Sequence, residues 1–231
     1  MEVVNLGYSY PDGTVALNGV DFRITHGESV ALIGENGAGK STLLTHLNGS
    51  LLASAGEVRI GDLVVSKRNL PVIRSTVGMV FQNADDQLFM PTVEDDVSFG
   101  PLNMGLSNDE VIRRIDSALD LVGVLSLKKR SSHRLSGGEK RRVAIASVLS
   151  MEPKILAMDE PTSGLDPKSR RLLIALLKSF NQTKILASHD FDMIAGVCDR
   201  TIVIYKGEVA ADGPTAEILA DISLLERCSL S

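Results

Sequence analysis

Cysteine and long apolar runs are both scarce in this sequence of 231 residues. Its two cysteines, Cys198 and Cys228, lie thirty positions apart without the spacing of a disulfide framework or a metal site. No cleavable apolar leader precedes the first polar residues, so a reduced cytoplasmic setting is expected. The charge-free stretch 41–56 is interrupted by polar and glycine residues and falls short of the roughly 18 to 20 apolar residues that a bilayer span needs. Any membrane role is therefore expected to depend on a partner protein.

Positive charge is also in deficit, with 24 Lys and Arg against 29 Asp and Glu and a net charge of -5. This balance gives no general attraction to nucleic acid, and no nucleic-acid partner is expected. No Lys or Arg occurs from 75 to 112, yet "VFQNADDQLFMPTVEDDVSFG", 80–100, contains five carboxylates: Asp85, Asp86, Glu94, Asp95 and Asp96. A metal ion, the dipoles of local helices or the basic side chains of another protein would each neutralise them.

Internal repeats and linkers rich in Pro, Gly or Ser are absent, which predicts one domain over 1–231. Short buried runs of strand character, each followed by polar residues and then a helical pattern, predict a mostly parallel α/β sheet. These runs are 29–33, 76–81, 154–159 and 184–188. Between 93 and 149 apolar residues recur at helical spacing, as in 111–125, which predicts an inserted helical lobe.

A glycine-rich loop, "GENGAGKST", 34–42, follows the first of these buried runs and precedes a helical pattern. It fits G-x-x-x-x-G-K-[ST], in which glycines turn backbone N–H groups toward phosphates, the lysine reaches the β and γ phosphates and the serine hydroxyl binds Mg²⁺. The predicted nucleotide-binding residues here are Gly34, Glu35, Asn36, Gly37, Ala38, Gly39, Lys40, Ser41 and Thr42.

Two acidic residues end the run "ILAMDEP", 155–161. Asp159 is predicted to hold the metal through its coordinated water, and Glu160 to polarise the attacking water as the base. The alternative is that the two acids only cap the loop after a strand, and the presence of a phosphate-binding loop in the same chain disfavours it.

Gln82 and His189 each follow a predicted strand, so both emerge at the carboxyl edge of the sheet, where ligands bind in open α/β folds. Each alone is typical of an ordinary loop residue. Together with a complete nucleotide site they are predicted to be catalytic sensors of the γ-phosphate and the metal. The predicted metal-binding residues are then Ser41, Gln82 and Asp159.

A second anion-binding helix end is predicted at "LSGGEKRRVAIASVL", 135–149. Its anion-binding residues are Ser136, Gly137 and Gly138. A nucleotide easily occupies only one such end within its own subunit, so two chains arranged head to tail would form two composite sites. Lys140, Arg141 and Arg142 are then expected near bound phosphates, and 128–130 is expected to be a solvated loop.

In their order, and over nearly the whole chain, these motifs resemble those of the ATP-binding cassette (ABC) ATPases: "GENGAGKST", Gln82, "LSGGE", "ILAMDE", "SGLD" and His189. The resemblance implies ATP and Mg²⁺ as cofactors and an α/β P-loop NTPase fold. That fold has a mostly parallel sheet, an N-terminal antiparallel β part and an inserted α-helical lobe. The RecA-like core would cover 1–82 and 154–231, and the lobe about 83–150.

The resemblance also assigns roles outside the phosphate loop. Asp166 of "SGLD" would communicate between the two sites, and Tyr10 of "YSYP" would stack on the adenine, with Tyr8 as its rival. The second subunit would be another copy of the chain or a paralogous ATPase. Glu139 stands where the family usually has Gln, a common variant that suits the positive helix end.

Part of the acidic stretch has a local explanation. Thr92 before Glu94, Asp95 and Asp96 has the pattern of an N-cap with acids in the first helical turn, where the dipole stabilises each by roughly 0.3 to 1 kcal/mol.

Asp85 and Asp86 differ because they lead into apolar residues predicted to be exposed, and an acidic rim beside an apolar patch suits a basic amphipathic helix of a partner. A metal site there would lack a His or further ligand. The segments "FQNADDQLF" and "TVEDDVSFGPLNMGLS" are very similar to those of energy-coupling-factor and cobalt or nickel importer ATPases, where they meet Arg-bearing coupling helices of a transmembrane protein. The missing cations would then lie on the partner. The predicted partner-binding residues are Asp85, Asp86, Gln87, Leu88 and Phe89.

The function favoured by the resemblance is an ATP-hydrolysing subunit, peripheral on the cytoplasmic face of the cell membrane, that works with a transmembrane coupling protein and a substrate-binding membrane component. Cobalt or nickel is favoured over vitamins as cargo, because vitamin-type relatives commonly continue with a C-terminal extension, whereas this chain stops at Ser231 soon after a helix predicted over 214–226. The rival is a soluble ABC ATPase acting on ribosomes or DNA, but the second cassette or long coiled-coil insertion usual in such proteins is absent.

Overall fold

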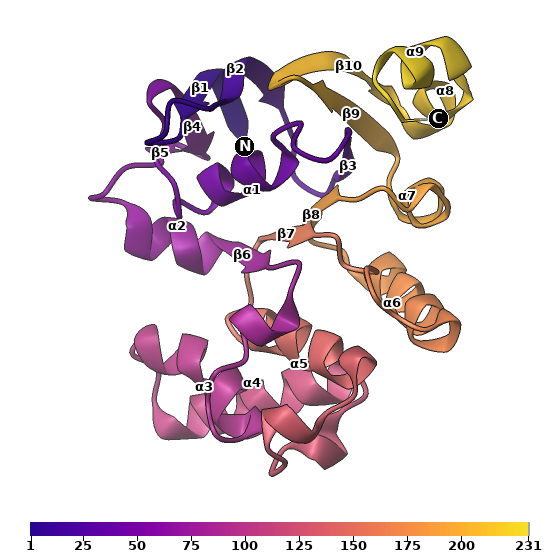
Figure 1. The fold of residues 1–231 in the computed structure, drawn as a ribbon. Coiled ribbons are helices and arrows are strands. Elements are labelled where there is room, and N and C mark those ends of the chain that lie inside the picture. Colours follow the sequence, from indigo (N-terminus) through magenta and orange to yellow (C-terminus); the bar gives the residue numbers. More distant parts are fainter. Residues whose placement is uncertain (231) are drawn as a thin grey trace.

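Two β-sheets and the helices around them make up residues 1–230, the part of the chain that the computed structural model describes (Figure 1). The strands are β1 (Glu2–Ser9), β2 (Val15–Arg23), β3 (Ser29–Ile33), β4 (Ala55–Ile60), β5 (Leu63–Val64), β6 (Val77–Val80), β7 (Ile155–Asp159), β8 (Thr183–Ala187), β9 (Arg200–Tyr205) and β10 (Glu208–Pro214). The α-helices are α1 (Lys40–Leu47), α2 (Leu70–Thr76), α3 (Val93–Asn103), α4 (Asn108–Leu121), α5 (Gly137–Leu149), α6 (Pro167–Ser179), α7 (Phe191–Val197), α8 (Thr215–Ala220) and α9 (Ile222–Arg227). Short 3₁₀ turns are η1 (Ala84–Asp86), η2 (Leu125–Leu127) and η3 (Ser132–Arg134).

The larger sheet has the strand order β10-β9-β3-β8-β7-β6. From β9 to β6 the strands run parallel, and β10 pairs antiparallel with β9 at the edge. Each of the four short buried runs of the sequence forms one of these strands, so the predicted mostly parallel sheet is confirmed. In β3, Val30 and Leu32 face one apolar core while Ala31 and Ile33 face another, because side chains alternate between the two faces of a strand. Burial on both faces explains the continuous apolar run.

The smaller sheet has the order β2-β1-β4-β5, and all its pairs are antiparallel. Its inward residues, such as Leu6 and Val58, share an apolar core with α1 and with one face of the larger sheet. This confirms the antiparallel N-terminal part of the predicted fold.

A group of helices, α3, α4 and α5, occupies the chain between β6 and β7 and lies beneath the two sheets in Figure 1. Helix α4 begins after Ser107, whose hydroxyl accepts from the N–H of Glu110 and so caps its start. Its buried residues, Val111, Ile115, Ala118 and Leu119, form one apolar face at helical spacing. The periodicity of 111–125 therefore marks a real helix, although it starts three residues earlier and ends at Leu121.

The single helix predicted over 214–226 is wrong. Two helices of six residues, α8 and α9, meet at Asp221, whose φ and ψ of -82° and 81° are not helical. The Asp221 carboxylate accepts from the N–H of Leu224 at 2.9 Å, so this residue starts a new helix.

The packing of α5 against β6 depends on Gly78. A Cβ at this position would lie 2.3 Å from Cγ1 of Val148 and 2.9 Å from Cγ of Pro153. We expect Gly78→Ala to lower the free energy of unfolding by about 1–3 kcal/mol, because the helix must shift to admit the methyl group. Urea unfolding followed by circular dichroism measures this change.

The matched control is Gly196→Ala in α7, where the added Cβ would meet only the flexible end of Lys178, at 3.3 Å. This change should be neutral or stabilise by up to about 1 kcal/mol, since alanine is the better helix former. Equal unfolding midpoints for the two variants would contradict the close approach at Gly78.

Candidate functional site

A cavity of about 510 Å³ lies at the carboxyl edge of the larger sheet. The loops after β3, β6, β7 and β8 all reach it, because parallel pairing brings the carboxyl ends of these strands together. The predicted site residues that line it are Tyr10, Asn36, Gly37, Gly39, Lys40, Ser41, Thr42, Gln82, Asp159, Glu160 and His189. Gly34, Glu35 and Ala38 belong to the same loop between β3 and α1.

The loop conformation depends on its glycines. Gly39 has a φ of 108°, and a Cβ there would lie 2.6 Å from the carbonyl oxygen of Ala16. Gly39 is also the N-cap of α1, with no side-chain cap bond, so the first N–H groups of the helix remain available to a ligand. A helix N-terminus of this kind, facing a cavity, is a site for an anion.

Lys40 is buried and folds back on the loop that carries it. Its ammonium donates to the carbonyl oxygens of Gly34 at 2.6 Å and Glu35 at 3.0 Å. Burial lowers the pKa of Lys40, and the nearby carboxylates of Glu160 and Asp159 oppose that shift. The ammonium therefore lies at the cavity wall between carbonyl oxygens and carboxylates.

Asp159 ends β7 inside the same wall. Burial raises its pKa, while a hydrogen bond from the Ser41 side chain lowers it. A divalent cation would favour the charged form of this carboxylate. One carboxylate and one hydroxyl beside a phosphate-binding loop fit Mg²⁺, which takes few protein oxygens and completes its shell with phosphates and water.

Glu160 adopts an uncommon backbone conformation with a φ of 42°. Among the non-glycine residues of 1–230 with positive φ, it alone lines this cavity. Its carboxylate accepts from the hydroxyl of Ser188 at 3.1 Å and lies 2.9 Å from Nδ1 of His189. Left-handed backbone at a bulky residue persists where surrounding structure imposes it, often at functional sites. The side chain is thus aimed at the cavity and oriented by two neighbours.

The loop that carries His189 is anchored by Asp190, a residue that the motifs did not single out. Its carboxylate accepts from Nε of Arg170 at 2.7 Å and from the hydroxyl of Thr162 at 2.9 Å. The Arg170 guanidinium lowers the pKa of Asp190 to about 2. This pairing links the loop after β8 to α6.

The two tyrosines have different surroundings. Tyr10 lines the cavity, is 39% exposed and shares a hydrogen bond of 2.8 Å between its hydroxyl and that of Thr42. Tyr8 packs edge to face against Tyr10 and His46, with ring centroids 5.2 Å and 4.7 Å away, and against the apolar core. Tyr10 is therefore the better placed of the two to meet a bound base.

The second predicted anion site lies apart from the cavity. Ser136 and Glu139 form a capping box at the start of α5, which satisfies two backbone N–H groups. A Cβ on Gly138 would lie 2.5 Å from the hydroxyl of Ser169, which itself donates to Asp166. Gly137 begins α5, and Asp166 caps α6, so both lie at this same junction. None of these residues lines the cavity in the described chain.

The predicted partner-binding segment 85–89 needs two corrections. Leu88, predicted to be exposed, is buried, whereas Phe89 is 59% exposed. Gln87 is also engaged internally: its side-chain N–H donates to the carbonyl oxygen of Ala144 at 2.7 Å.

The acidic stretch finds most of its partners within the chain. Asp85 pairs with Lys140 at 2.5 Å, and Glu94 pairs with both Lys128 and Lys129. The view that the missing cations all lie on another protein is therefore wrong. Residues 128–130 form a turn in which Lys129 and Arg130 are exposed, as predicted, although Lys128 and Lys129 also pair with Glu94. The sequence missed these pairs because they join residues more than thirty positions apart.

The remaining acids have local roles. The hydroxyl of Thr92 accepts from the N–H of Asp95, which confirms the predicted N-cap of α3. Asp96 is buried and accepts from the N–H groups of Phe89 and Met90, both at 2.9 Å. Asp86 is exposed and bonds only to the Asn83 side chain, at 3.2 Å, within residues 1–230.

The basic residues after the glycines of α5, expected near bound phosphates, each make a separate contact within the chain. Lys140 pairs with Asp85, and Arg142 donates to the carbonyl oxygens of Val122 and Gly123. Arg141 is buried, with its guanidinium on the carbonyl oxygens of 81 and 82. The signal for this burial was the spacing of Arg141 with the apolar residues three, four and seven positions later.

The family model described as ABC transporter matches residues 17–163 of the chain. The energy-coupling factor transporter ATP-binding protein EcfA of Methanothermobacter thermautotrophicus is 50% identical over 235 aligned positions, which cover 100% of this chain and 76% of that protein.

Two solved structures are similar over nearly the whole chain. CbiO1 of Clostridium perfringens, described as part of the ABC transporter complex cbiONQ, has a TM-score of 0.85 and 42% identity, covering 99% of this chain and 94% of its own. The ATP-binding cassette MJ0796, in a dimeric post-hydrolysis state bound to ADP and Pi, has a TM-score of 0.83 and 28% identity, covering 93% and 98%.

Two substitutions separate binding from hydrolysis at the cavity. We expect Lys40→Ala to abolish tight ATP binding, because the positive charge for the phosphates is lost. We expect Glu160→Gln to bind ATP, to hydrolyse it at least roughly 100-fold more slowly and to accumulate a dimer. Phosphate release and size exclusion with ATP and Mg²⁺ measure both effects, with the exposed Glu226→Gln as the control. A Glu160→Gln protein that turns over like the parent would remove Glu160 from the role of base.

Proposed function

The chain belongs to the ABC transporter family as an ATPase of the energy-coupling-factor type, and we propose that it energises a membrane importer, with cobalt or nickel as cargo. The observation that carries the ATPase part of this proposal is the cavity in which a phosphate-binding loop, Lys40, Asp159 and Glu160 meet. These groups are the ones that hydrolysis of a nucleoside triphosphate requires.

In the proposed reaction the triphosphate of ATP lies along the N–H groups at the start of α1. The Lys40 ammonium exchanges its bonds to Gly34 and Glu35 for the β and γ phosphates. Ser41, Asp159 and Gln82 would hold Mg²⁺, which neutralises the charge of the transferred phosphoryl group when bound.

The Glu160 carboxylate orients and polarises the attacking water, since Ser188 and His189 already fix its direction. Gln82 and His189 contact the γ-phosphate and report its presence. Tyr10 stacks on the adenine at the outer wall of the cavity.

We further propose that two chains, or this chain and a paralogous ATPase, dimerise head to tail around two ATP molecules. The separation of Ser136, Gly137 and Gly138 from the cavity supports this arrangement, because a helix end outside its own site can serve the site of a second subunit. The dimeric state of the similar cassette MJ0796 supports it as well. Asp166, next to the same helix end through Ser169, would then lie at the junction of the two sites.

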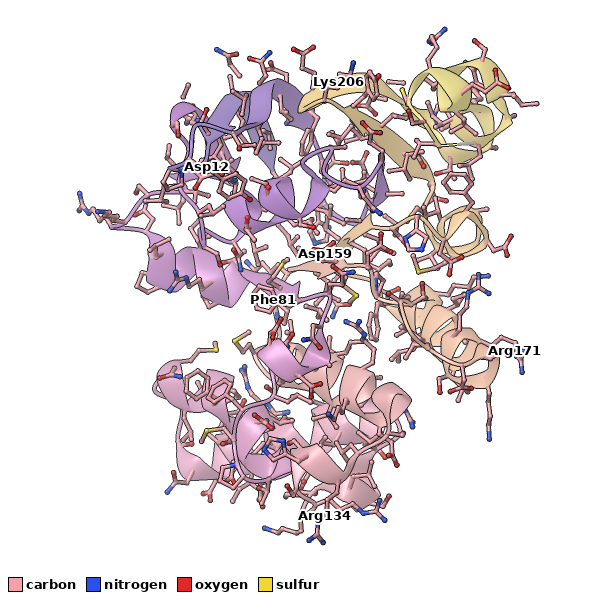
Figure 2. All side chains as sticks on the ribbon, viewed as in Figure 1. Asp12, Phe81, Arg134, Asp159, Arg171 and Lys206 are labelled. Atoms are coloured by element: carbon pink, nitrogen blue, oxygen red, sulfur yellow. The ribbon has the colours of Figure 1, made fainter. Side chains whose placement is uncertain are left out.

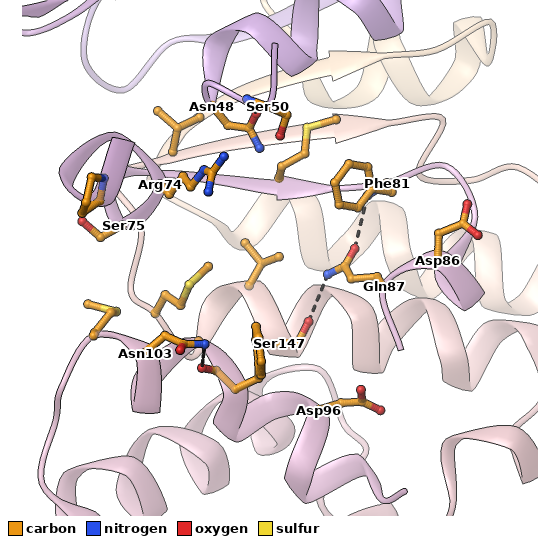
Figure 3. A pocket seen from close by; sticks show the side chains of 18 of the residues that line it. Asn48, Ser50, Arg74, Ser75, Phe81, Asp86, Gln87, Asp96, Asn103 and Ser147 are labelled. Atoms are coloured by element: carbon orange, nitrogen blue, oxygen red, sulfur yellow. Dashed lines mark hydrogen bonds between the residues drawn. The ribbon is translucent and has the colours of Figure 1, made fainter. Parts of the chain in front are cut away.

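A second, larger hollow supports the membrane partner. It has a volume of about 760 Å³ and lies between α2 and β6 on one side and α3 and α5 on the other (Figure 3). Most of its wall is apolar, with Phe89 packed edge to face on Phe99 at 5.3 Å, and Asp86 lies at its rim. We propose that a basic amphipathic helix of a transmembrane coupling protein docks here.

None of the helices in residues 1–230 is both long and apolar enough to cross a bilayer. We propose a peripheral location on the cytoplasmic face of the cell membrane, because the proposed coupling protein and a substrate-binding membrane component would hold the chain there. The proposed cargo follows the family resemblance and the similarity to CbiO1 of the cbiONQ complex. Vitamins are the alternative cargo, and uptake of labelled cobalt, nickel or vitamins into vesicles with the membrane components would decide between them.

A soluble ATPase on ribosomes or DNA is the competing function. The apolar hollow with an acidic rim favours a protein helix over the phosphates of a nucleic acid, which would be repelled by Asp86. Co-purification from detergent-solubilised membranes, compared with co-sedimentation on ribosomes or DNA, separates the two.

Asp86 and Phe89 test the docking site. We expect Asp86→Asn with Phe89→Ala to reduce co-purification of the membrane partner and transport by at least about tenfold. The double variant loses both a charge contact and an aromatic side chain that docking would bury. Hydrolysis by the isolated protein should remain near the parent rate. Asp62→Asn, an exposed carboxylate in the turn before β5, is the matched control. Normal assembly of the double variant would show that the partner docks elsewhere.

A further inference from the structure

Arg141 of α5 is a buried arginine without a carboxylate partner. It is 4% exposed. One of its guanidinium nitrogens donates to the carbonyl oxygen of Phe81 at 2.7 Å, and another donates to that of Gln82. None of the ion pairs in the described chain includes it. Its charge is thus held by two backbone oxygens of the segment that follows β6.

Such an arrangement is a poor way to stabilise a fold. Removing a guanidinium from water is unfavourable, and Arg141 has no ion pair in the described chain to offset that cost. Burial lowers the pKa of Arg141, and the charge of Asp159 opposes this shift. The contact therefore calls for an explanation in terms of what it positions.

The contacted segment leads directly into the ATP site. Gln82 lies two residues after the end of β6, and its side chain lines the cavity together with Asp159. Figure 2 labels Phe81 and Asp159 near each other, where the sheet meets the helices beneath it. Arg141 holds this segment by its backbone and leaves the amide of Gln82 free to face the cavity.

A second contact ties the same segment to the same helix. The side chain of Gln87 accepts from the N–H of Phe81 at 3.2 Å and donates to the carbonyl oxygen of Ala144 at 2.7 Å. Residues 81 and 82 are therefore fixed to α5 through two side chains. A movement of α5 relative to β6 would therefore displace residues 81 and 82.

Arg141 also lies close to the glycine end of α5. It is four residues after Gly137, which corresponds to about 6 Å of helix. A rigid turn of helix therefore separates the group that holds Gln82 from the end proposed to serve the ATP of the partner subunit.

We propose that Arg141 is a positioning residue that locks the backbone of Gln82 to α5, so that Gln82 at one ATP site and the Ser136–Gly138 helix end at the other move together. The inference rests on the proposed head-to-tail ATPase. ATP bound at one site would then affect the position of Gln82 at the other site, through the Arg141 guanidinium and one turn of α5.

The test uses Arg141→Met, Arg141→Lys, Gln82→Ala and the double variant Arg141→Met with Gln82→Ala. Methionine keeps much of the volume without charge, and lysine keeps the charge without the planar fork that reaches two carbonyl oxygens. Turnover is measured with the full chain at saturating ATP and Mg²⁺. Binding of ATP to the monomer is measured separately by calorimetry with Lys40 intact.

We expect Arg141→Met to lower kcat by at least about tenfold while monomer affinity for ATP stays within about threefold of the parent, with Arg141→Lys in between. The double variant should be no slower than Gln82→Ala alone, because Arg141 acts through Gln82. Arg114→Gln is the matched control, since Arg114 also bonds a backbone carbonyl, that of Met151, but lies away from the cavity. Any loss of kcat in Arg114→Gln should multiply with the loss in Gln82→Ala, because the two residues act independently.

Several results would overturn the proposal. A double variant whose loss equals the product of the single losses would place the action of Arg141 elsewhere. A kcat close to that of the parent in Gln82→Ala or Arg141→Met would also overturn the proposal. So would an Arg141→Met defect that disappears when turnover is measured well below the unfolding temperature of the variant, because the defect would then come from unfolding. Failure of the proposed head-to-tail ATPase is distinct, because Glu160→Gln would then form no dimer with ATP and Mg²⁺ in size exclusion, whatever the Arg141 variants do.

Discussion

Parallel hydrogen bonding between neighbouring strands is the constraint on which the site depends. The register pairs Val80 with Met158 and Asp159 with Ala187, so the ends of β6, β7 and β8 fall side by side. Residues more than a hundred positions apart, such as Gln82 and His189, therefore line one cavity. The N–H of Glu160 donates to the carbonyl oxygen of Ala187 at 2.8 Å, which extends this pairing one residue beyond the strands. Gln82, Glu160 and His189 lie in loops, but each follows the end of a paired strand by one or two residues, which restricts where it can lie.

Features encoded in a short stretch of sequence could be predicted, and features that depend on packing could not. The phosphate loop, the acids at the end of β7 and the cap at Thr92 need only local spacing and composition. The surroundings of 85–89 required knowledge of which face of α5 lies beneath it, since Lys140 and Ala144 supply the contacts. The burial of Leu88 has the same origin. A segment without Lys or Arg in the sequence can still have cations beside it in the fold, because folding brings Lys128, Lys129 and Lys140 to it.

Helix α5 is common to the proposed contacts of the protein. Its first residues lie beside Ser169 and the start of α6, its second turn holds the segment after β6, and its last turn lines the hollow through Ser147 and Val148. A helix of thirteen residues is stiff over this length. The proposed docking at the hollow and the proposed contact of the helix end with a second subunit would therefore act on one rigid helix.

The backbone of Glu160 has a consequence for how the sequence can change. A φ of 42° is unfavourable for glutamate by roughly 1 kcal/mol or more, whereas glycine adopts it freely. Replacement by glycine would relieve this strain but remove the carboxylate proposed as the base, so a stabilising change at this position would work against the proposed hydrolysis. Engineering for higher stability should leave residue 160 unchanged and substitute residues remote from the cavity. A stabilising change at residue 160 would remove a group proposed to be needed for turnover.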